Sequence, residues 1–311
     1  MEMPWLVIVN PNAGAGKCGE DWPEISKILH DENMNFHIEM TNRRFHALIL
    51  TRNKISEGYR KIIVVGGDGT LNEVLNGVFA QQEIPTTEIT LGMIPVGTGN
   101  DWARMFEISK DYRKAIQIIK TGKTFVQDAG KVSFMKSERQ FKRYFLNIAG
   151  IGFDALIASK SNRLKEKGKR NALVYFWNIF LGLFNYHFFS ANVSIDGKQS
   201  SLNIFSMNVG ICKFNGGGMM QVPDAIPNDG IFDLTIIKKV GRFSVLKSLP
   251  MLYNGKIKKH PKVVSFNAKS IKIESGKSVF LETDGESLGH TPFEFEIIPR
   301  SVKVITGKRS A

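Results

Sequence analysis

A run of β-branched residues followed by a glycine-rich turn constrains this chain more than any other feature. Residues 62–77 read Ile-Ile-Val-Val-Gly-Gly-Asp-Gly-Thr-Leu-Asn-Glu-Val-Leu-Asn-Gly. The first four residues predict a strand buried on both faces of a parallel sheet. After the turn, Thr70 is a candidate helix cap with Glu73 in the capping-box position, and residues of helical spacing follow: Leu71, Val74, Leu75 and Val78.

The turn itself predicts a phosphate site. Gly66, Gly67 and Gly69 leave room for a ligand to approach the backbone. A helix start also has N–H groups without intrahelical acceptors, and these suit a phosphate. Asp68 would repel that phosphate unless a cation lay between them, so we expect a divalent cation. The alternative is a plain turn between strand and helix.

Two more apolar segments, residues 6–9 and 91–94, end in loops rich in small residues. The first loop is not a Walker A sequence, because Pro11 stands where its first glycine should be and Cys18 where its Ser or Thr should be. Strands alternate with helices through this half, including a strand at 36–40 and helices at 45–55 and 112–120. This order predicts a right-handed parallel α/β sheet with ligands at the carboxyl ends of its strands.

Short alternating runs replace this pattern from Thr124 onward. They lie at 125–131, 144–148, 193–195, 202–209, 232–237, 270–273 and 278–281, and Asp-Gly pairs follow at 196–197, 229–230 and 284–285. Asp-Gly is a strong hairpin signal, so we expect an antiparallel β domain, in the form of a sandwich.

Four ordered motifs resemble the diacylglycerol kinase and sphingosine kinase family, and most closely the soluble bacterial lipid kinases of this length. They are Asn10-Pro11 with its small residues, Gly66-Gly67-Asp68-Gly69-Thr70, Pro95-Val96-Gly97-Thr98-Gly99-Asn100-Asp101, and Asp284-Gly285-Glu286. The resemblance implies a Rossmann-like nucleotide-binding α/β domain over 1–123, rejoined by 300–311, and a β-sandwich lipid-substrate domain over 124–299. It also implies ATP and Mg²⁺ as cofactors.

The resemblance assigns site residues as follows. The catalytic group comprises Asp284 as general base, with Asp68, Asp101 and Glu286. The nucleotide-binding group comprises Asn10, Pro11, Asn12, Ala13, Gly14, Thr41, Gly66, Gly67, Asp68, Gly69, Thr70, Leu71, Asn72 and Thr98. A structural magnesium loop at 224–231 would use Asp229 and the carbonyls of Ile226 and Ile231. From spacing alone, Asp284 reads as a plain hairpin turn, Asn100-Asp101 as a helix cap, and Asp229 as an ion-free turn.

A net charge of +13 and a pI near 9.6 favour anionic partners. Residues 160–170 hold six basic residues and one acid, and residues 172–189 are almost wholly apolar. That stretch is a buried core helix, a helix at a membrane interface or, less favoured, a true span. Two cysteines form no disulfide framework, and we see no signal peptide. We therefore expect a cytoplasmic protein in peripheral contact with the inner face of an anionic membrane, with a homodimer allowed.

The function implied by the resemblance is an ATP-dependent lipid kinase of the diacylglycerol type. One alternative is an NAD kinase-like phosphotransferase acting on a soluble alcohol, because that class shares the Gly-Gly-Asp-Gly loop. The other is a non-catalytic nucleotide- or nucleic-acid-binding protein. The charge permits it, but no nucleic-acid motif is recognisable, so we expect no nucleic-acid partner.

Overall fold

The computed structural model describes residues 3–166, 182–183 and 186–308. The chain divides into two compact units, Met1–Ala129 with Arg300–Ala311, and Gly130–Pro299. Strands β5 (Thr124–Lys136) and β16 (Glu286–Ile305) each carry the chain from one unit to the other.

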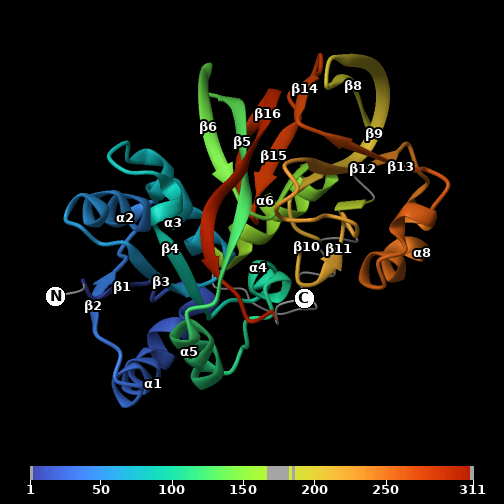
Figure 1. Ribbon diagram of the computed structural model, residues 1–311. Coiled ribbons are helices and arrows are strands. Elements are labelled where there is room, and N and C mark those ends of the chain that lie inside the picture. Colours follow the sequence, from blue (N-terminus) through green and yellow to red (C-terminus); the bar gives the residue numbers. More distant parts are fainter. Residues whose placement is uncertain (1–2, 167–181, 184–185, 309–311) are drawn as a thin grey trace. The chain divides into compact units, whose positions relative to one another are not determined.

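The first unit is built on a parallel sheet in the order β2-β1-β3-β4, with the end of β16 beside β4. Its strands are β1 (Trp5–Val9), β2 (Phe36–Met40), β3 (Lys61–Gly66) and β4 (Thr90–Pro95). Its helices are α1 (Lys17–Asp31), α2 (His46–Ser56), α3 (Asp68–Ala80), α4 (Asp101–Met105) and α5 (Tyr112–Thr121), with short 3₁₀ turns at Ala13–Gly16 and Thr86–Glu88. Helices α2 and α3 lie on one face of the sheet, and α1 and α5 on the other (Figure 1).

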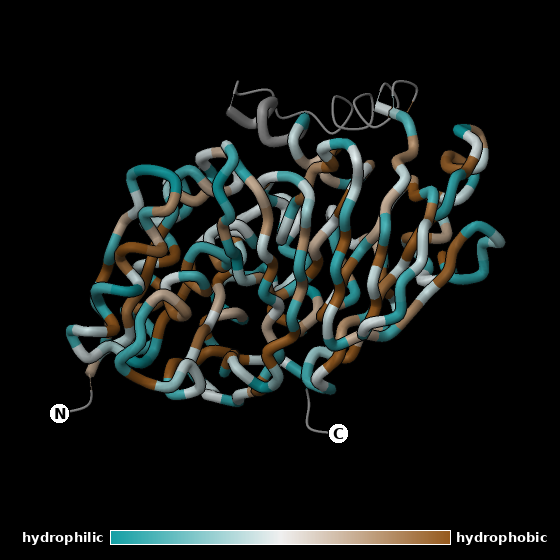
Figure 2. Tube along the Cα trace, turned by 90° about the horizontal axis from the view of Figure 1, so that it is seen from above, coloured by the Kyte–Doolittle hydropathy of each residue, from teal (hydrophilic) through white to brown (hydrophobic). Residues whose placement is uncertain are grey.

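Burial explains why the inner strands are continuous apolar runs. Residues 6–9 and 62–65 have no exposed surface, because helices cover both faces of the sheet there. At the sheet edge, β2 leaves Ile38 and Met40 substantially exposed. Hydrophobic residues concentrate along the strands, whereas the turns are mostly hydrophilic (Figure 2). The parallel α/β prediction for this half is therefore confirmed.

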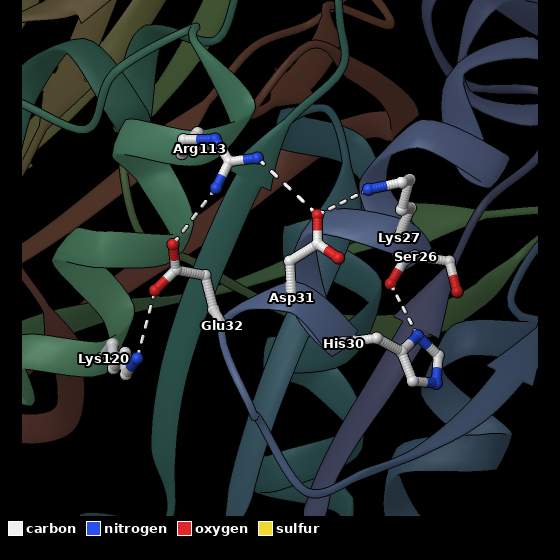
Figure 3. Close-up of polar contacts among 7 residues, drawn as sticks. All are labelled: Ser26, Lys27, His30, Asp31, Glu32, Arg113 and Lys120. Atoms are coloured by element: carbon white, nitrogen blue, oxygen red, sulfur yellow. Dashed lines mark hydrogen bonds and ion pairs between the residues drawn. The ribbon is translucent and has the colours of Figure 1, made fainter.

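Ion pairs join α1 and α5 at the surface (Figure 3). Arg113 lies 3.3 Å from Glu32 and 3.8 Å from Asp31, and Lys120 lies 3.0 Å from Glu32. Exposed pairs of this kind contribute about 0–1 kcal/mol each. The apolar contacts of both helices with the sheet, such as those of Ile25 and Ile116, therefore contribute more to this packing.

The second unit is rich in antiparallel strands. They are β6 (Arg139–Phe145), β7 (Ile148–Gly152), β8 (Phe189–Ile195), β9 (Lys198–Gly210), β10 (Phe214–Asn215), β11 (Met219–Met220), β12 (Phe232–Lys238), β13 (Val263–Ala268), β14 (Ser270–Glu274) and β15 (Phe280–Thr283), with parts of β5 and β16. Their pairings close a ring in the order β7-β9-β8-β14-β16-β15, which returns to β7. Strands β12 and β13 extend from β9, and β5 pairs with β6.

Two details of the predicted strands and turns change, and two of the predicted hairpins are confirmed. The run at 144–148 is not one strand, because β6 ends at Phe145 and β7 begins at Ile148. Two Asp-Gly pairs, at 196–197 and 284–285, form two-residue hairpin turns. The pair at 229–230 does not: the Ile231 N–H donates to the Asp229 carboxylate, and the loop leads directly into β12.

Helices α6 (Phe153–Glu166) and α8 (Arg242–Tyr253), with a 3₁₀ turn at Ile257–Lys259, complete the described part of this unit. The predicted apolar helix at 172–189 lies largely outside the described residues, as do the side chains of the basic stretch beyond Lys160. Among the residues that the structure describes, no helix has the length and apolar character needed to cross a membrane.

Candidate active site

Four strand ends place the predicted nucleotide-binding residues along one edge of the parallel sheet. Val9 is in register with Met40 on one side and with Val65 on the other, and Gly66 is in register with Pro95. The loops that follow these strands therefore begin side by side, as expected for a ligand site in an open α/β sheet. Backbone hydrogen bonds from Asn10 N to Val65 O and from Val96 N to Gly66 O join three of them.

The two glycine loops touch each other, and their glycines are required for this. A Cβ added to Gly97 would lie 2.9 Å from the Gly67 Cα and 2.5 Å from Asn100 Oδ1. A Cβ on Gly66 would lie 2.8 Å from Thr70 Oγ1. Separations below 3.0 Å are not tolerated, so a side chain at Gly97 would push the loops apart, and one at Gly66 would displace Thr70 within the same turn. Here glycine serves close packing, since neither residue has a positive φ.

Thr70 does not cap the helix that follows the first glycine loop. Helix α3 begins two residues earlier, at Asp68, with Gly67 as its N-cap residue. The Thr70 hydroxyl instead accepts a hydrogen bond of 2.9 Å from Asn10 Nδ2, which joins two loops that are 60 residues apart. Glu73 does not complete a capping box either: its carboxylate accepts the N–H groups of Phe45 and Ala47 at the start of α2.

Asp68 links the two glycine loops through helix α4. Its two carboxylate oxygens each accept a backbone N–H, from Asp101 and Trp102, at 3.1 Å. Asp68 therefore occupies the capping role that the sequence suggested for Asn100. The Asn100 amide nitrogen donates to Gly97 O, while its Oδ1 is buried and has no hydrogen-bond partner among the described residues. Asp101 is buried, with Arg104 4.0 Å from its carboxylate.

The remaining predicted nucleotide-binding residues divide into two groups. At the loop surface lie Pro11, Asn12, Ala13, Gly14, Gly69 and the exposed Thr98. Thr41 follows β2, is buried, and donates its N–H to Val9 O. The side chains of Leu71 and Asn72 instead lie inside the unit: Leu71 is 2% exposed, and the fully buried Asn72 accepts from Asn76.

In the second unit, Asp284 occupies the first position of the two-residue turn between β15 and β16. Asp284 and Gly285 both have positive φ, 49° and 83°, and Thr283 pairs with Glu286 across the turn. The Asp284 carboxylate accepts N–H groups from Leu146, Asn147 and Ile148 at 3.1, 3.0 and 3.3 Å. A carboxylate held by three amides has a fixed orientation.

The proposed magnesium loop presents oxygen ligands in an acidic environment. Asp229 is exposed, and its Oδ1 accepts the Ile231 N–H, while Ile226 is 53% exposed. The pKa of Asp233 is raised, first by burial and then by the negative charges of Asp229 and Asp224. Lys258 forms an ion pair with Asp224 and offsets part of this charge, while a carboxylate and carbonyl oxygens are ligand types that fit a hard cation such as Mg²⁺. The described residues hold no cluster of three or more His, Cys, Asp or Glu side chains with metal-site geometry.

The sequence analysis did not single out two buried carboxyl groups in the same unit, Asp154 and Glu282. Burial raises the pKa of Asp154 and raises that of Glu282 to about 8. The sequence signal for Glu282 is its position two residues before Asp284. The signal for Asp154 is its position just after Gly152 and Phe153, at the end of a strand. Both signals are weak without the fold, because their partners come from distant segments.

Comparison with known proteins identifies both parts of the chain. The family model "Diacylglycerol kinase catalytic domain" matches residues 4–132. The model "YegS C-terminal NAD kinase beta sandwich-like domain" matches residues 147–306.

Individual relatives extend over nearly the whole length. A protein of Bacillus subtilis (strain 168) named "Putative lipid kinase YtlR" is 30% identical over 97% of this chain and 99% of its own. A "Diacylglycerol kinase" of Staphylococcus carnosus (strain TM300) is 29% identical over 97% and 94% of the two chains. A solved structure titled as a putative diacylglycerol kinase from Bacillus anthracis str. Sterne has a TM-score of 0.79 and 27% identity, over 98% and 95%. Yeast NADH kinase shares the fold alone, with a TM-score of 0.52 and 12% identity over 99% and 85%.

Proposed function

Because this chain belongs to the diacylglycerol kinase family, we propose that it is an ATP-dependent lipid kinase that transfers the γ-phosphate to a lipid hydroxyl. The observation that carries the proposal is the meeting of three loops, after β1, β3 and β4, at one sheet edge. Asn10, Thr70, Asp68 and the paired glycines hold these loops together. Such an edge, with a helix start behind a glycine turn, suits a nucleotide phosphate chain.

In this proposal, the residues of the first unit bind and orient ATP. The glycine loops bring backbone N–H groups next to the phosphates, and Asn100 Oδ1 offers an unpaired acceptor to a hydroxyl or to a water on a metal ion. Mg²⁺, when bound, would neutralise phosphate charge. Asp68 contributes negative charge beside the phosphates, but its two oxygens also cap α4. We therefore assign Asp68 both loop positioning and water-mediated contact with the cation.

The residues of the second unit would handle the acceptor. The lipid hydroxyl loses its proton to the Asp284 carboxylate as its oxygen bonds to the γ-phosphorus, and the bond from that phosphorus to the β-phosphate oxygen breaks to release ADP. The three amides that orient Asp284 support this role, since a general base must be held in place. Glu286 and Asp101 would support the site, and Asp229 with the carbonyls of Ile226 and Ile231 would hold a structural Mg²⁺.

A peripheral contact with the inner, anionic face of a membrane completes the proposal. Between Asp233 and Glu274 the sequence has no acidic residue and ten lysines or arginines. Helix α8 lies in this segment and exposes Phe243 (76%) and Tyr253 (52%). Aromatic side chains among basic residues favour a surface of anionic lipid. Free cysteines at 18 and 212 agree with a cytoplasmic location.

One experiment tests the proposed reaction. Purified protein is incubated with ATP-Mg²⁺ and a total lipid extract, and phosphorylated products are sought by mass spectrometry, with NAD and no vesicles in a parallel reaction. We expect a phosphorylated lipid alcohol and unchanged NAD. Phosphorylation of NAD alone would support the soluble-alcohol alternative, and no transfer to either would refute a kinase of this class.

A further inference from the structure

A buried glutamate holds the turn that carries Asp284. Glu282 is 1% exposed, and its Oε2 accepts the Gly285 N–H at 2.8 Å. Its Oε1 accepts Asn215 Nδ2, also at 2.8 Å, from the hairpin of β10 and β11. The same Asn215 amide donates to Gln221 Oε1 at 3.1 Å. The turn is thus tied through Glu282 to a segment almost 70 residues earlier in the chain.

The chain of hydrogen bonds continues to a second buried carboxyl group. Gln221 Nε2 donates to Asp154 Oδ1 at 3.1 Å. The other oxygen of Asp154 accepts from Ser206 and, at 3.1 Å, from Asn208 Nδ2. Asn208 Oδ1 is buried and has no partner in the described part of the chain. Within the described ranges, the hydrogen-bond partners of both carboxyl groups are therefore neutral, and no cation pairs with either of them.

The space around Glu282 is shaped for its side chain. A Cβ added to Gly150 on β7 would lie 2.6 Å from Glu282 Oε1 and 3.0 Å from the Asp154 Cβ. The titratable groups that interact with Glu282 are Asp154 on α6 and Asp284 in the turn, and both act to keep it protonated. Burial is the larger cause, and together they raise the pKa of Glu282 to about 8. The Tyr186 hydroxyl keeps its proton, because burial and Asp154 raise its pKa, so it adds no charge near Asp154 and Glu282.

We propose that Glu282 is a positioning residue for the phosphoryl transfer: as a buried neutral acid bonded to Asn215 and Gly285, it fixes the turn that presents Asp284. The effect of Glu282 on turnover rests on the proposed function, whereas its hydrogen bonds with Asn215 and Gly285 do not depend on that function. Ionisation of Glu282 would place negative charge beside Asp284, in the buried surroundings that Glu282 shares with Asp154. The N–H groups of Asn215 and Gly285 bind the ionised carboxylate more strongly than the neutral acid, so the hydrogen bonds to the turn persist. What changes as the pH rises through about 8 is the negative charge beside Asp284.

The kinetic test compares wild type with Glu282→Gln, which cannot ionise and loses one of the two acceptor oxygens. Loss of one hydrogen bond should lower kcat about tenfold at pH 7, while KM for ATP stays within about twofold, because ATP is proposed to bind the other unit. Wild type should show a change of kcat with a midpoint near pH 8, and this change should be absent in Glu282→Gln. Glu296→Gln, exposed on β16 and paired with Lys131, is the matched control and should behave as wild type. Wild-type kcat in Glu282→Gln at pH 7, or the same change of kcat near pH 8 in both proteins, would overturn the inference.

A second measurement does not need turnover. In ¹⁵N-labelled protein, the Gly285 amide resonance should titrate with a midpoint near 8 in wild type and stay constant in Glu282→Gln. A Gly285 amide that does not titrate in wild type would overturn the inference even in an active enzyme. If it titrates but no lipid alcohol is phosphorylated, the proposed function is wrong and the hold of Glu282 on the turn is supported.

Discussion

Two Asp-Gly turns of the β-rich unit allow the proposed catalytic aspartate, Asp284, to be compared with a structural one, Asp196. Asp284 and Asp196 both open two-residue hairpin turns, with φ of 49° and 45°. Both carboxylates accept backbone N–H groups from a neighbouring segment; for Asp196 these belong to Lys269 and Ser270. Asp196 is exposed, whereas Asp284 is 7% exposed. Asn tolerates a positive φ, so the substitution of each by Asn changes charge without straining the turn.

The two effects of Asp284→Asn can be estimated separately. Asn keeps one acceptor oxygen, but its NH₂ group would face the Leu146 N–H, which leaves a buried donor unpaired at a cost of about 1–3 kcal/mol. A domain with about 5–15 kcal/mol of stability stays folded after that loss. Loss of a general base should instead reduce kcat about 10²- to 10⁴-fold. Asp196→Asn should change the free energy of unfolding by less than about 1 kcal/mol and leave kcat unchanged.

The assay is steady-state phosphorylation of whichever lipid alcohol the total-extract experiment yields as a product, normalised to the folded fraction from urea unfolding. A folded Asp284→Asn protein with kcat within a few-fold of wild type would refute the general-base role. Asp284 would then be a turn residue like Asp196. Equal losses of kcat in both variants would show that the assay reports turn stability and not proton transfer.

Three further predictions follow from contacts described above. Gly97→Ala should raise KM for ATP at least about tenfold, since its Cβ collides with the Gly67 backbone, whereas Gly276→Ala meets no atom within 4 Å and should have no effect in the same kinetic assay. The free energy of unfolding should fall as pH rises from about 4.5 to 8, by up to about 5 kcal/mol from Glu282, because the folded state retains a proton there that the unfolded state has lost. Glu282→Gln should flatten this fall in urea titrations, and an equal slope in both proteins would contradict the assignment. Phe243→Ser should weaken sedimentation with anionic vesicles, and Phe141→Ser, exposed on β6, should not; equal binding by both would place the membrane contact elsewhere.

The sequence predicts well those features whose cause is local. The β-branched run at 62–65 and the glycines after it predict a buried strand, a tight turn and a helix, and the structure contains all three. The Asp-Gly hairpin at 284–285 likewise follows from the φ preferences of its two residues.

Features set by distant partners could not be predicted. Thr70 is a residue type that often caps a helix, but its hydroxyl accepts a hydrogen bond from Asn10. The carboxylate of Asp68 instead caps helix α4, which begins 33 residues later. For the same reason, the chain of hydrogen bonds from Asp154 to Glu282 could not be predicted. Its members come from α6, from β10, from β15 and from the loop after β11. A single sequence indicates which residues are polar, whereas the fold determines which of them meet.

The parallel sheet of the first unit has a consequence for biosynthesis. Its strand order places the end of β16 against β4, with Lys303 beside Thr90 and Val304 beside Leu91. During translation, β4 is made more than 200 residues before this partner, so its outer edge stays unpaired until residues 303–304 have been synthesised. An open edge of apolar residues is prone to intermolecular pairing, and nascent or C-terminally truncated chains should therefore depend on chaperones.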